Sequence, residues 1–361
     1  MKIREKICKY LKMITFRRVK NALSVLRKEG WSGIKYHFYL VKDKEKESDK
    51  DCCKEYDTCI ISEEDAKRVW KVEELEPIQF EIQENPLVSI IIPVYNQVIY
   101  TYHCLKFIRK YTENIPYEII VGDDCSTDIT ASLETLVKGI RVVHHKERCQ
   151  FVVNCNRISE EARGKYLVFL NNDTQVQKEW LKALLDVMET MENVGLVGSK
   201  LVCPDGMVQE AGGIVWRDAH VLQFGKGKWT GGEVLNFMRE TDYISGASIM
   251  LRKELWDELG GFDEQFAPAY YEDVDLAFRM KEKGYKIIYQ PKSEVIHFEG
   301  ATEGRNKELE KRIEKNRKKF VKKWRNVLEK QYYRKDEYPL AIREIEKELL
   351  KNSRLNENFG C

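Results

Sequence analysis

The sequence has no long hydrophobic run. No apolar stretch approaches the roughly 18 to 20 residues that a helix needs to cross a bilayer. The first residues also lack the apolar stretch and the small-residue cleavage site of a signal peptide. These absences argue against a membrane-spanning or secreted protein, and we therefore expect a cytoplasmic location.

C-x-x-C pairs and a strong net charge are missing as well. The 10 cysteines include no C-x-x-C pair, so we expect reduced thiols rather than a disulfide framework. The formal net charge is only +2 over 361 residues, which argues against a dedicated nucleic-acid binder. With 43% apolar residues, the chain can build one sizeable core with appendages.

Glycine-rich phosphate-binding loops are the third absence. Neither GxGxxG nor GxxxxGK[ST] occurs in the chain. If the protein binds a nucleotide, its diphosphate must therefore be neutralised by a metal ion rather than by the backbone of a glycine-rich turn.

Short β-branched runs alternate with helical stretches from Leu87 onward. The runs VSIIIP, YEIIVGDD, IRVVHH and YLVFLNND are typical of strands in a parallel sheet. Helical patterns fall at 98–111, 128–138, 151–161 and 177–191, each long enough for a right-handed crossover. This order predicts an α/β domain whose mostly parallel sheet is flanked by helices. A helix near Glu272 and two short strands before Gly300 are expected to follow.

We divide the chain into four parts. Residues 1–50 form a basic amphipathic helical region with a linker, and 51–85 form a connecting segment. Residues 86–302 form the α/β domain, and 303–361 form a charged helical tail. The basic first helix has two interpretations of equal weight: it lies on an anionic membrane face, or it packs on the domain with a solvated basic side.

One apolar strand ends abruptly in Asn171, Asn172 and Asp173. Open α/β sheets bind ligands at the carboxyl ends of their strands. A carboxylate there, with an amide two positions before it, can hold a hard divalent cation through oxygen and leave coordination positions for phosphate. The alternative is a turn that merely ends the strand.

Polar residues also follow the first two strands. Pro93, Tyr95 and Asn96 end the first strand, and Asp123 and Asp124 end the second. We expect both groups to line one crevice. An acidic residue after the second strand can accept hydrogen bonds from ribose hydroxyls or from a base N–H. This arrangement predicts a nucleotide site.

An acidic cluster begins the later helix. Glu272 and Asp273 follow two tyrosines at its start, where capping alone would explain one carboxylate. A general base for a sugar hydroxyl is the functional interpretation. His297 ends a later strand and is either structural or able to complete the coordination of a metal ion.

Six segments occur in an order that resembles glycosyltransferase family 2 enzymes of the GT-A fold, in particular their bacterial rhamnosyltransferase-like branch. They are VSIIIPVYN, EIIVGDDCSTD, ARGKYLVFLNNDT, YISGASIMLRKELWDELGGFDEQF, YYEDVDLAFRMKEKGY and VIHFEGAT. The resemblance covers about residues 86–302. It implies a GT-A type, Rossmann-like sheet between helices, with helical extensions at both ends.

The resemblance also implies roles for single residues. The positions that match the binding site for a nucleotide sugar are Pro93, Tyr95, Asn96, Asp123, Asp124, Asn156, Asn172, Gly246 and Ala247. The chain departs from the family at Gln150, which stands where a glycine usually precedes an aromatic residue.

Metal and catalytic positions follow from the same resemblance. Asn171 and Asp173 match the metal-binding pair, with Asn in place of the usual first Asp, and Asp173 is the preferred direct ligand. His297 matches a position that reaches the metal or the diphosphate. The implied ion is Mn²⁺ or Mg²⁺. Asp273 matches the catalytic base, and Glu272 is its acidic neighbour.

The resemblance implies an inverting, metal-dependent glycosyltransferase of the hexosyl or deoxyhexosyl kind. Its donor is a nucleotide-diphosphate sugar, with UDP or dTDP favoured, and its acceptor is a glycan or a lipid-linked hydroxyl in cell-surface polysaccharide synthesis. Peripheral contact with the inner face of the membrane is part of this expectation. The alternatives are a non-catalytic binding module with the same fold and, less favoured because no triphosphate loop is present, a sugar nucleotidyltransferase.

Overall fold

The computed structural model describes residues 54–300, 306–331, 345 and 348. The chain divides into two compact units, one of residues 52–215 and 219–328 and the other of 1–51, 216–218 and 329–361. The expected helical region at 1–50, and nearly all of 332–361, lie outside the described residues. All elements discussed below belong to the larger unit.

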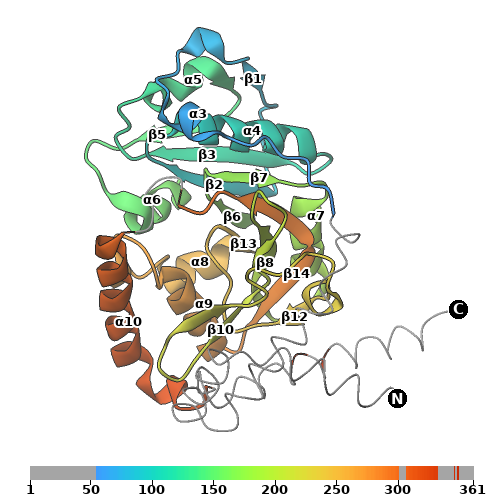
Figure 1. Cartoon of the computed structure of the whole chain (residues 1–361), viewed down its shortest axis with the longest axis vertical. Coiled ribbons are helices and arrows are strands. Elements are labelled where there is room, and N and C mark those ends of the chain that lie inside the picture. Colours follow the sequence, from blue (N-terminus) through green and yellow to red (C-terminus); the bar gives the residue numbers. More distant parts are fainter. Residues whose placement is uncertain (1–53, 301–305, 332–344, 346–347, 349–361) are drawn as a thin grey trace, which may run out of the picture. The chain divides into compact units, whose positions relative to one another are not determined.

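A ten-stranded sheet forms the centre of this unit. Its strand order is β12-β14-β8-β13-β6-β2-β3-β5, with β7 paired to β14 and β9 paired to β8. Figure 1 shows this order running from the lower to the upper part of the view. The bounds are β2 (Val88–Val94), β3 (Tyr117–Asp123), β5 (Arg141–His144), β6 (Tyr166–Leu170), β7 (Thr174–Val176), β8 (Val194–Val202), β9 (Val208–Glu210), β12 (Arg239–Glu240), β13 (Ser248–Arg252) and β14 (Lys286–His297).

The two halves of the sheet differ in direction. Strands β6, β2, β3 and β5 are parallel, as the sequence predicts. All seven residues of β2 are buried, which explains its unbroken apolar run. β13 runs antiparallel to both β6 and β8, whereas β14 is parallel to β8. The carboxyl ends of β2, β3 and β6 therefore meet at one edge.

The C-terminal strands depart from the expected pattern in one respect. The sequence predicts two short strands before Gly300, but β14 is a single strand of 12 residues. An irregularity between Gln290 and Glu294 shifts its register against β8. The shift lets one strand continue across the sheet and then pair with β7, so that His297 lies opposite Thr174.

Helices occupy most of the expected ranges. Their bounds are α3 (Glu63–Lys67), α4 (Val98–Tyr111), α5 (Leu133–Leu136), α6 (Gln150–Ser159), α7 (Trp180–Thr190), α8 (Lys253–Leu259), α9 (Glu272–Glu282) and α10 (Lys307–Leu328). The prediction of one helix over 128–138 is wrong. This range is divided into the 3₁₀ turn η3 (Ile129–Ser132), α5 and the short strand β4 (Val137–Lys138).

Small elements complete the unit. β1 (Ile78–Gln79) pairs with β4, and β10 (Gly213–Val215) forms a hairpin with β11 (Val221–Gln223). The remaining 3₁₀ turns are η2 (Val72–Glu74), η4 (Glu233–Leu235) and η5 (Glu264–Phe266). The predicted fold class, an α/β domain with helices around a largely parallel sheet, is confirmed.

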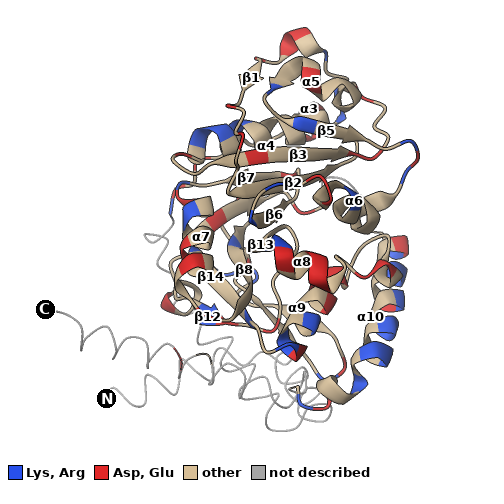
Figure 2. Cartoon of the chain, turned by 180° about the vertical axis from the view of Figure 1, so that it is seen from behind, with Lys and Arg blue, Asp and Glu red and all other residues tan. Residues whose placement is uncertain are grey.

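Helix α10 is part of this unit, although the sequence divides it from the domain as a tail. Asn316, Phe320, Trp324 and Leu328 are buried at a spacing of four residues. This single stripe packs inward, and Lys and Arg occupy much of the remaining helix surface (Figure 2). None of the described helices is long and apolar enough to cross a membrane.

Candidate functional site

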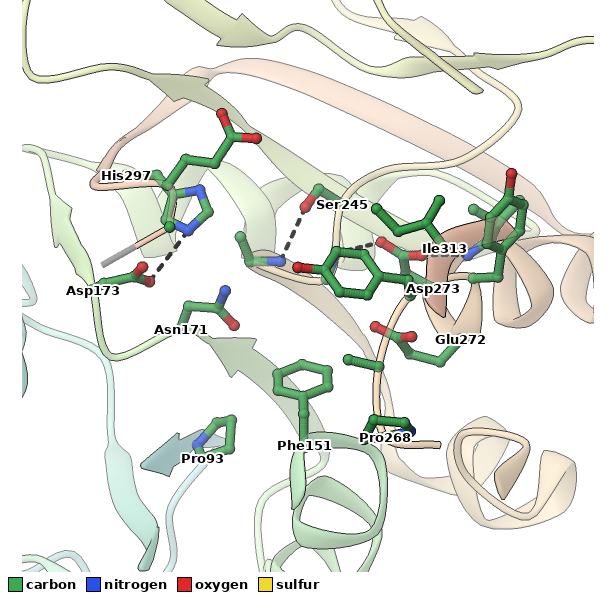
Figure 3. Close-up of a pocket in the computed structure, with 18 of the residues that line it drawn as sticks. Pro93, Phe151, Asn171, Asp173, Ser245, Pro268, Glu272, Asp273, His297 and Ile313 are labelled. Atoms are coloured by element: carbon green, nitrogen blue, oxygen red, sulfur yellow. Dashed lines mark hydrogen bonds and ion pairs between the residues drawn. The ribbon is translucent and has the colours of Figure 1, made fainter. Parts of the chain in front are cut away.

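One cavity of about 790 Å³ lies at the carboxyl ends of β2, β3 and β6. The first turn of α9, the segment before β13 and the end of β14 also line it (Figure 3). The predicted site residues that it brings together are Pro93, Tyr95, Asp124, Asn171, Asn172, Asp173, Gly246, Ala247, Glu272, Asp273 and His297. Asp173 and Asp273, which are 100 positions apart in the sequence, therefore line a common cavity.

The end of β6 places Asp173 against His297. The His297 Nε2 atom lies 3.2 Å from the Asp173 carboxylate, and Figure 3 shows this contact beside Asn171. The backbone fixes the pair, because the Phe298 N–H donates to the Asp173 carbonyl at 2.9 Å. Burial alone would lower the pKa of His297, but the Asp173 carboxylate outweighs burial and raises it.

Asn171 and Gln209 extend this end of the cavity. The Oδ1 atom of Asn171 is buried and has no hydrogen-bond partner. Gln209 Oε1 lies 3.0 Å from His297 Nδ1, which orients the imidazole and turns Nε2 toward Asp173. The described residues contain no group of three or more His, Cys, Asp or Glu side chains arranged for a metal ion. A cation here would therefore depend on amide and ligand oxygens as well.

Asn172 is attached to α4. Its amide donates to the Thr101 hydroxyl at 3.0 Å, and its side chain is buried at the cavity wall. This bond fixes the strand end against the helix that follows β2.

Asp124 and Tyr95 line the part of the cavity at the ends of β2 and β3. The Asp124 carboxylate accepts the backbone N–H groups of Cys149 and Gln150 at 2.6 and 2.9 Å, which caps the start of α6. The Arg148 guanidinium stacks 3.5 Å from the centre of the Tyr95 ring. Gln150 has a φ of 64°, a left-handed conformation that accounts for the glycine expected at this position.

Three predicted donor-binding residues do not line the cavity. Asn156 is held by other contacts, because its side chain bonds both the Phe262 N–H and the Phe262 carbonyl at 2.9 Å. Asp123 accepts from Ser126 N at 2.9 Å and contacts His144 at 2.8 Å. Asn96 accepts the backbone N–H of Thr127 at 2.7 Å. Each of the three side chains bonds residues of a neighbouring loop. What they share in this structure is that they stabilise the conformation of those loops.

Glu272 and Asp273 open α9 at the opposite side of the cavity. Asp273 accepts the N–H groups of Val274 at 2.8 Å and Gly246 at 3.1 Å. Glu272 is 6% exposed, and its Oε2 atom has no hydrogen-bond partner. Burial and the adjacent Asp273 carboxylate raise the pKa of Glu272 well above its usual value, and burial also raises the pKa of Asp273.

The backbone before these carboxylates is strained. Tyr270 and Tyr271 have φ values of 78° and 75°. Residues other than glycine adopt this region at a cost of about 1 kcal/mol or more. Tyr271 is the residue that precedes α9, and its hydroxyl donates to the Ala219 carbonyl at 2.7 Å. Tertiary contacts therefore hold the turn that presents Glu272 and Asp273.

Sequence reasoning missed Glu210, a third carboxylate in the cavity wall. It is fully buried and accepts the Ser245 N–H at 2.8 Å and the Tyr243 hydroxyl at 3.3 Å. Burial, assisted by the nearby Asp273 carboxylate, raises the pKa of Glu210 to about 7. Because Ser245 precedes Gly246, Glu210 and Asp273 bond adjacent N–H groups. In the sequence, Glu210 is a single acidic residue before two glycines, and such a residue forms no pattern that predicts a place in the cavity wall.

Helix α10 supplies two further lining residues, Arg312 and Ile313. The sequence did contain a signal for this helix: the four-residue spacing of Asn316, Phe320, Trp324 and Leu328 predicts one packed face. That spacing does not reveal which surface the helix covers.

Residues 89–259 match the model of the family described as glycosyl transferase family 2. This matched segment is just under half of the chain. Among curated proteins, it is 28% identical over 243 residues to the O-antigen biosynthesis protein RfbC of Myxococcus xanthus, covering 62% of this chain and 18% of that protein. It is 24% identical over 218 residues to the O-antigen chain rhamnosyltransferase WbaN of Salmonella anatum, covering 59% and 66% respectively.

The matches cover only part of the length of the longer relatives. The chain is 27% identical over 244 residues to an uncharacterised protein, y4gI, of Sinorhizobium fredii, covering 64% of this chain but 26% of that protein. The match thus spans about a quarter of y4gI and a fifth of RfbC.

Two solved structures are similar at low identity. The mannosyltransferase PcManGT of Pyrobaculum calidifontis, in complex with GDP-Man and Mn²⁺, aligns with a TM-score of 0.48 at 18% identity, covering 91% of this chain and 80% of that one. GalNAc-T7 with UDP, GalNAc and Mn²⁺ aligns with a TM-score of 0.47 at 15% identity, covering 59% and 44%.

Proposed function

We propose that the chain is an inverting, metal-dependent glycosyltransferase that moves a sugar from a nucleoside diphosphate to an acceptor hydroxyl. One observation carries the proposal: the Asp173–His297 pair and the Glu272–Asp273 pair line the same cavity. A transferase of this kind needs a site for an anionic leaving group and a carboxylate base that face one substrate. The match of residues 89–259 to the family 2 model supports the same class.

The nucleotide occupies the region of Pro93, Tyr95 and Asp124 in this proposal. Tyr95 offers a ring face beside the Arg148 guanidinium, and Asp124 lies on the same wall. A planar base fits a stacking surface of this kind. The donor carries UDP or dTDP, and its sugar extends toward Gly246 and Ala247.

A divalent cation, Mn²⁺ or Mg²⁺, fits the donor atoms at the end of β6. Asp173 would hold it directly, with the unpartnered Asn171 Oδ1 and His297 Nε2 as further ligands. When bound, such an ion supplies positive charge that stabilises the departing diphosphate.

Asp273 serves as the general base. Its carboxylate removes the proton from the acceptor hydroxyl while that oxygen bonds to the anomeric carbon and the bond to the diphosphate breaks. A single displacement inverts the anomeric configuration. The N–H groups of Gly246 and Val274 hold the carboxylate in place, and the raised pKa of Asp273 makes it a stronger base than an exposed aspartate.

The acceptor in this proposal is a glycan or lipid-linked hydroxyl in cell-surface polysaccharide synthesis, and the sugar is a hexose or deoxyhexose. The similarity to O-antigen proteins, one of them named as a rhamnosyltransferase, supports this setting. Transfer takes place in the cytoplasm, and contact of residues 1–50 with the inner face of the membrane belongs to the same proposal.

The test is a thermal-shift panel of UDP, dTDP and GDP, each with and without Mn²⁺ or Mg²⁺. We expect selective, metal-dependent stabilisation by UDP or dTDP. Turnover is then measured with the corresponding nucleotide sugars, and the anomeric configuration of the product is determined by NMR. Stabilisation without turnover across a broad acceptor panel would indicate a binding module. Pyrophosphate release from nucleoside triphosphates would indicate a nucleotidyltransferase.

A further inference from the structure

Asn316 of α10 joins this helix to the loop before α9. Its side-chain nitrogen lies 2.7, 3.0 and 3.0 Å from the carbonyl oxygens of Phe266, Ala269 and Tyr270, so its two N–H groups are shared among three acceptors. The residue is 1% exposed. A single amide that contacts three carbonyls of one short loop constrains the path of that loop.

The loop depends on partners from outside itself. Its carbonyl at Pro268 accepts the Val152 N–H of α6 at 3.1 Å, and the Lys319 ammonium bonds the carbonyl of Gln265. Asn316 binds three further carbonyls of this segment, those of Phe266, Ala269 and Tyr270. Loss of its amide would remove a buried hydrogen-bond donor from all three, which is unfavourable.

The same loop leads directly into the strained turn. Tyr270 and Tyr271 have left-handed backbone conformations, and Tyr271 is the residue that precedes α9. Glu272 and Asp273 follow at once, so the direction of both carboxylates depends on a conformation that the chain does not favour locally. Such conformations persist where surrounding contacts determine them.

A second set of contacts fixes α10 against α9. The Trp324 indole N–H donates to Asp275 at 2.7 Å, and Lys323 pairs with the same carboxylate. The Phe320 ring contacts the rings of Phe266, Tyr271, Phe278 and Trp324. Helix α10 therefore holds both the loop and the first turn that carry the predicted base.

We propose that Asn316 is a positioning residue, which keeps the Phe266–Tyr270 loop in the conformation that points Asp273 at the acceptor hydroxyl. The inference rests on the proposed function. It assigns part of the active-site architecture to a helix that lies beyond the segment matched by the family, residues 89–259. Asn316 acts through the loop and does not touch the substrate.

The test compares Asn316→Leu with the wild-type chain. Leucine has the same branched arrangement of side-chain heavy atoms, although its methyl groups are bulkier than the amide, and its side chain has no N–H groups. We expect kcat to fall at least tenfold while the KM for the donor and the metal-dependent affinity for the nucleotide stay within twofold. Hydrogen exchange should become faster in residues 266–275 and remain unchanged in 166–176.

Two controls separate positioning from general destabilisation. Val187→Ala creates a small cavity in α7 and should lower the melting temperature without changing kcat below that temperature. Lys318→Ala alters an exposed residue of α10 and should change nothing. If Asn316→Leu lowers only the melting temperature, as Val187→Ala does, or weakens nucleotide binding as much as kcat, the inference is wrong. Unchanged exchange in 266–275 also overturns it, whereas a wild-type chain without transfer refutes the proposed function instead.

Discussion

The two ends of the cavity are built by different means. At one end, Asp173 and His297 are placed by strand pairing, since His297 lies opposite Thr174 and the Phe298 N–H bonds the Asp173 carbonyl. At the other end, Glu272 and Asp273 follow a turn with two left-handed tyrosines, which loop and helix contacts hold. A sheet register fixes its residues through regular backbone bonds, whereas the turn depends on particular side chains. The second end should therefore be more sensitive to distant substitutions.

The largest effect is expected for Asp273→Asn. Loss of the proposed general base should lower turnover by about 10²- to 10⁴-fold. Metal-dependent nucleotide binding should stay nearly unchanged, because it depends on the other end of the cavity. Turnover is measured by release of the nucleoside diphosphate, with Asp257→Asn on the exposed side of α8 as the matched control. Full turnover in the Asp273 variant would refute its role.

Asp173→Asn should act on the opposite end. It removes the charged ligand of the proposed cation and should abolish the metal-dependent part of nucleotide stabilisation. Turnover should fall by more than the roughly 10- to 100-fold that loss of a residue supporting a metal ligand costs. Thermal shifts with UDP and dTDP, with and without Mn²⁺, provide the measurement. Asp186→Asn on α7 is the control. Undiminished metal dependence would exclude Asp173 as a ligand.

Glu210→Gln tests how strongly the carboxylates are desolvated at the end of the cavity where Glu272 and Asp273 begin α9. The pKa of Glu210 is raised to about 7 in the folded chain, so its protonated form stabilises the fold at low pH. That contribution is lost as pH rises from the unfolded value near 4.5 to about 7. The wild-type chain should therefore lose up to about 3 kcal/mol of stability relative to Glu210→Gln between pH 4 and 8.

Urea unfolding of both chains at pH 4, 6 and 8 measures this difference. Glu161→Gln, at an exposed position, serves as the control and should give a much smaller change. A constant difference between wild type and Glu210→Gln across the range would show that Glu210 ionises like an exposed glutamate.

The smallest effect is expected for Asn156→Ala. It removes the bonds to both backbone groups of Phe262 and should lower the free energy of unfolding by about 1–2 kcal/mol. Donor affinity should not change, since Asn156 lies outside the cavity lining. Urea unfolding and nucleotide titration measure the two quantities. A loss of nucleotide affinity with normal stability would restore the donor-binding role expected from sequence.

The parallel half of the sheet and the β6 end of the site are accessible from sequence because their signals are local. The apolar run of β2 and the abrupt change from Leu170 to Asn171 identify a strand and its ligand-facing end without knowledge of the rest of the fold. Strand pairing then brings His297 to the same place. The helix predicted at residues 98–111 is confirmed as α4. Its apolar pattern is continuous along the sequence, so the pattern alone was enough to predict it.

The features that sequence could not supply depend on tertiary context. Tyr270 and Tyr271 have no local preference for a left-handed backbone, so the turn before α9 exists because other elements impose it. Asn156 matches a donor-binding position, yet its amide fits the backbone of Phe262. Glu210 is recognisable as a site residue only when β9 is seen beside Ser245. Matching of motifs cannot distinguish a side chain that faces a ligand from one that supports a loop.

The aromatic face of α10 sets a lower limit on how far the chain can be shortened. A chain that ended at residue 302 would uncover the rings of Phe266, Tyr271 and Phe278, which Phe320 now shields from water. It would also leave Asp275 buried beside Arg279 without Lys323 and Trp324. Such a fragment would expose an apolar patch and aggregate, so a fragment that keeps the cavity and its α9 wall intact has to extend through Leu328.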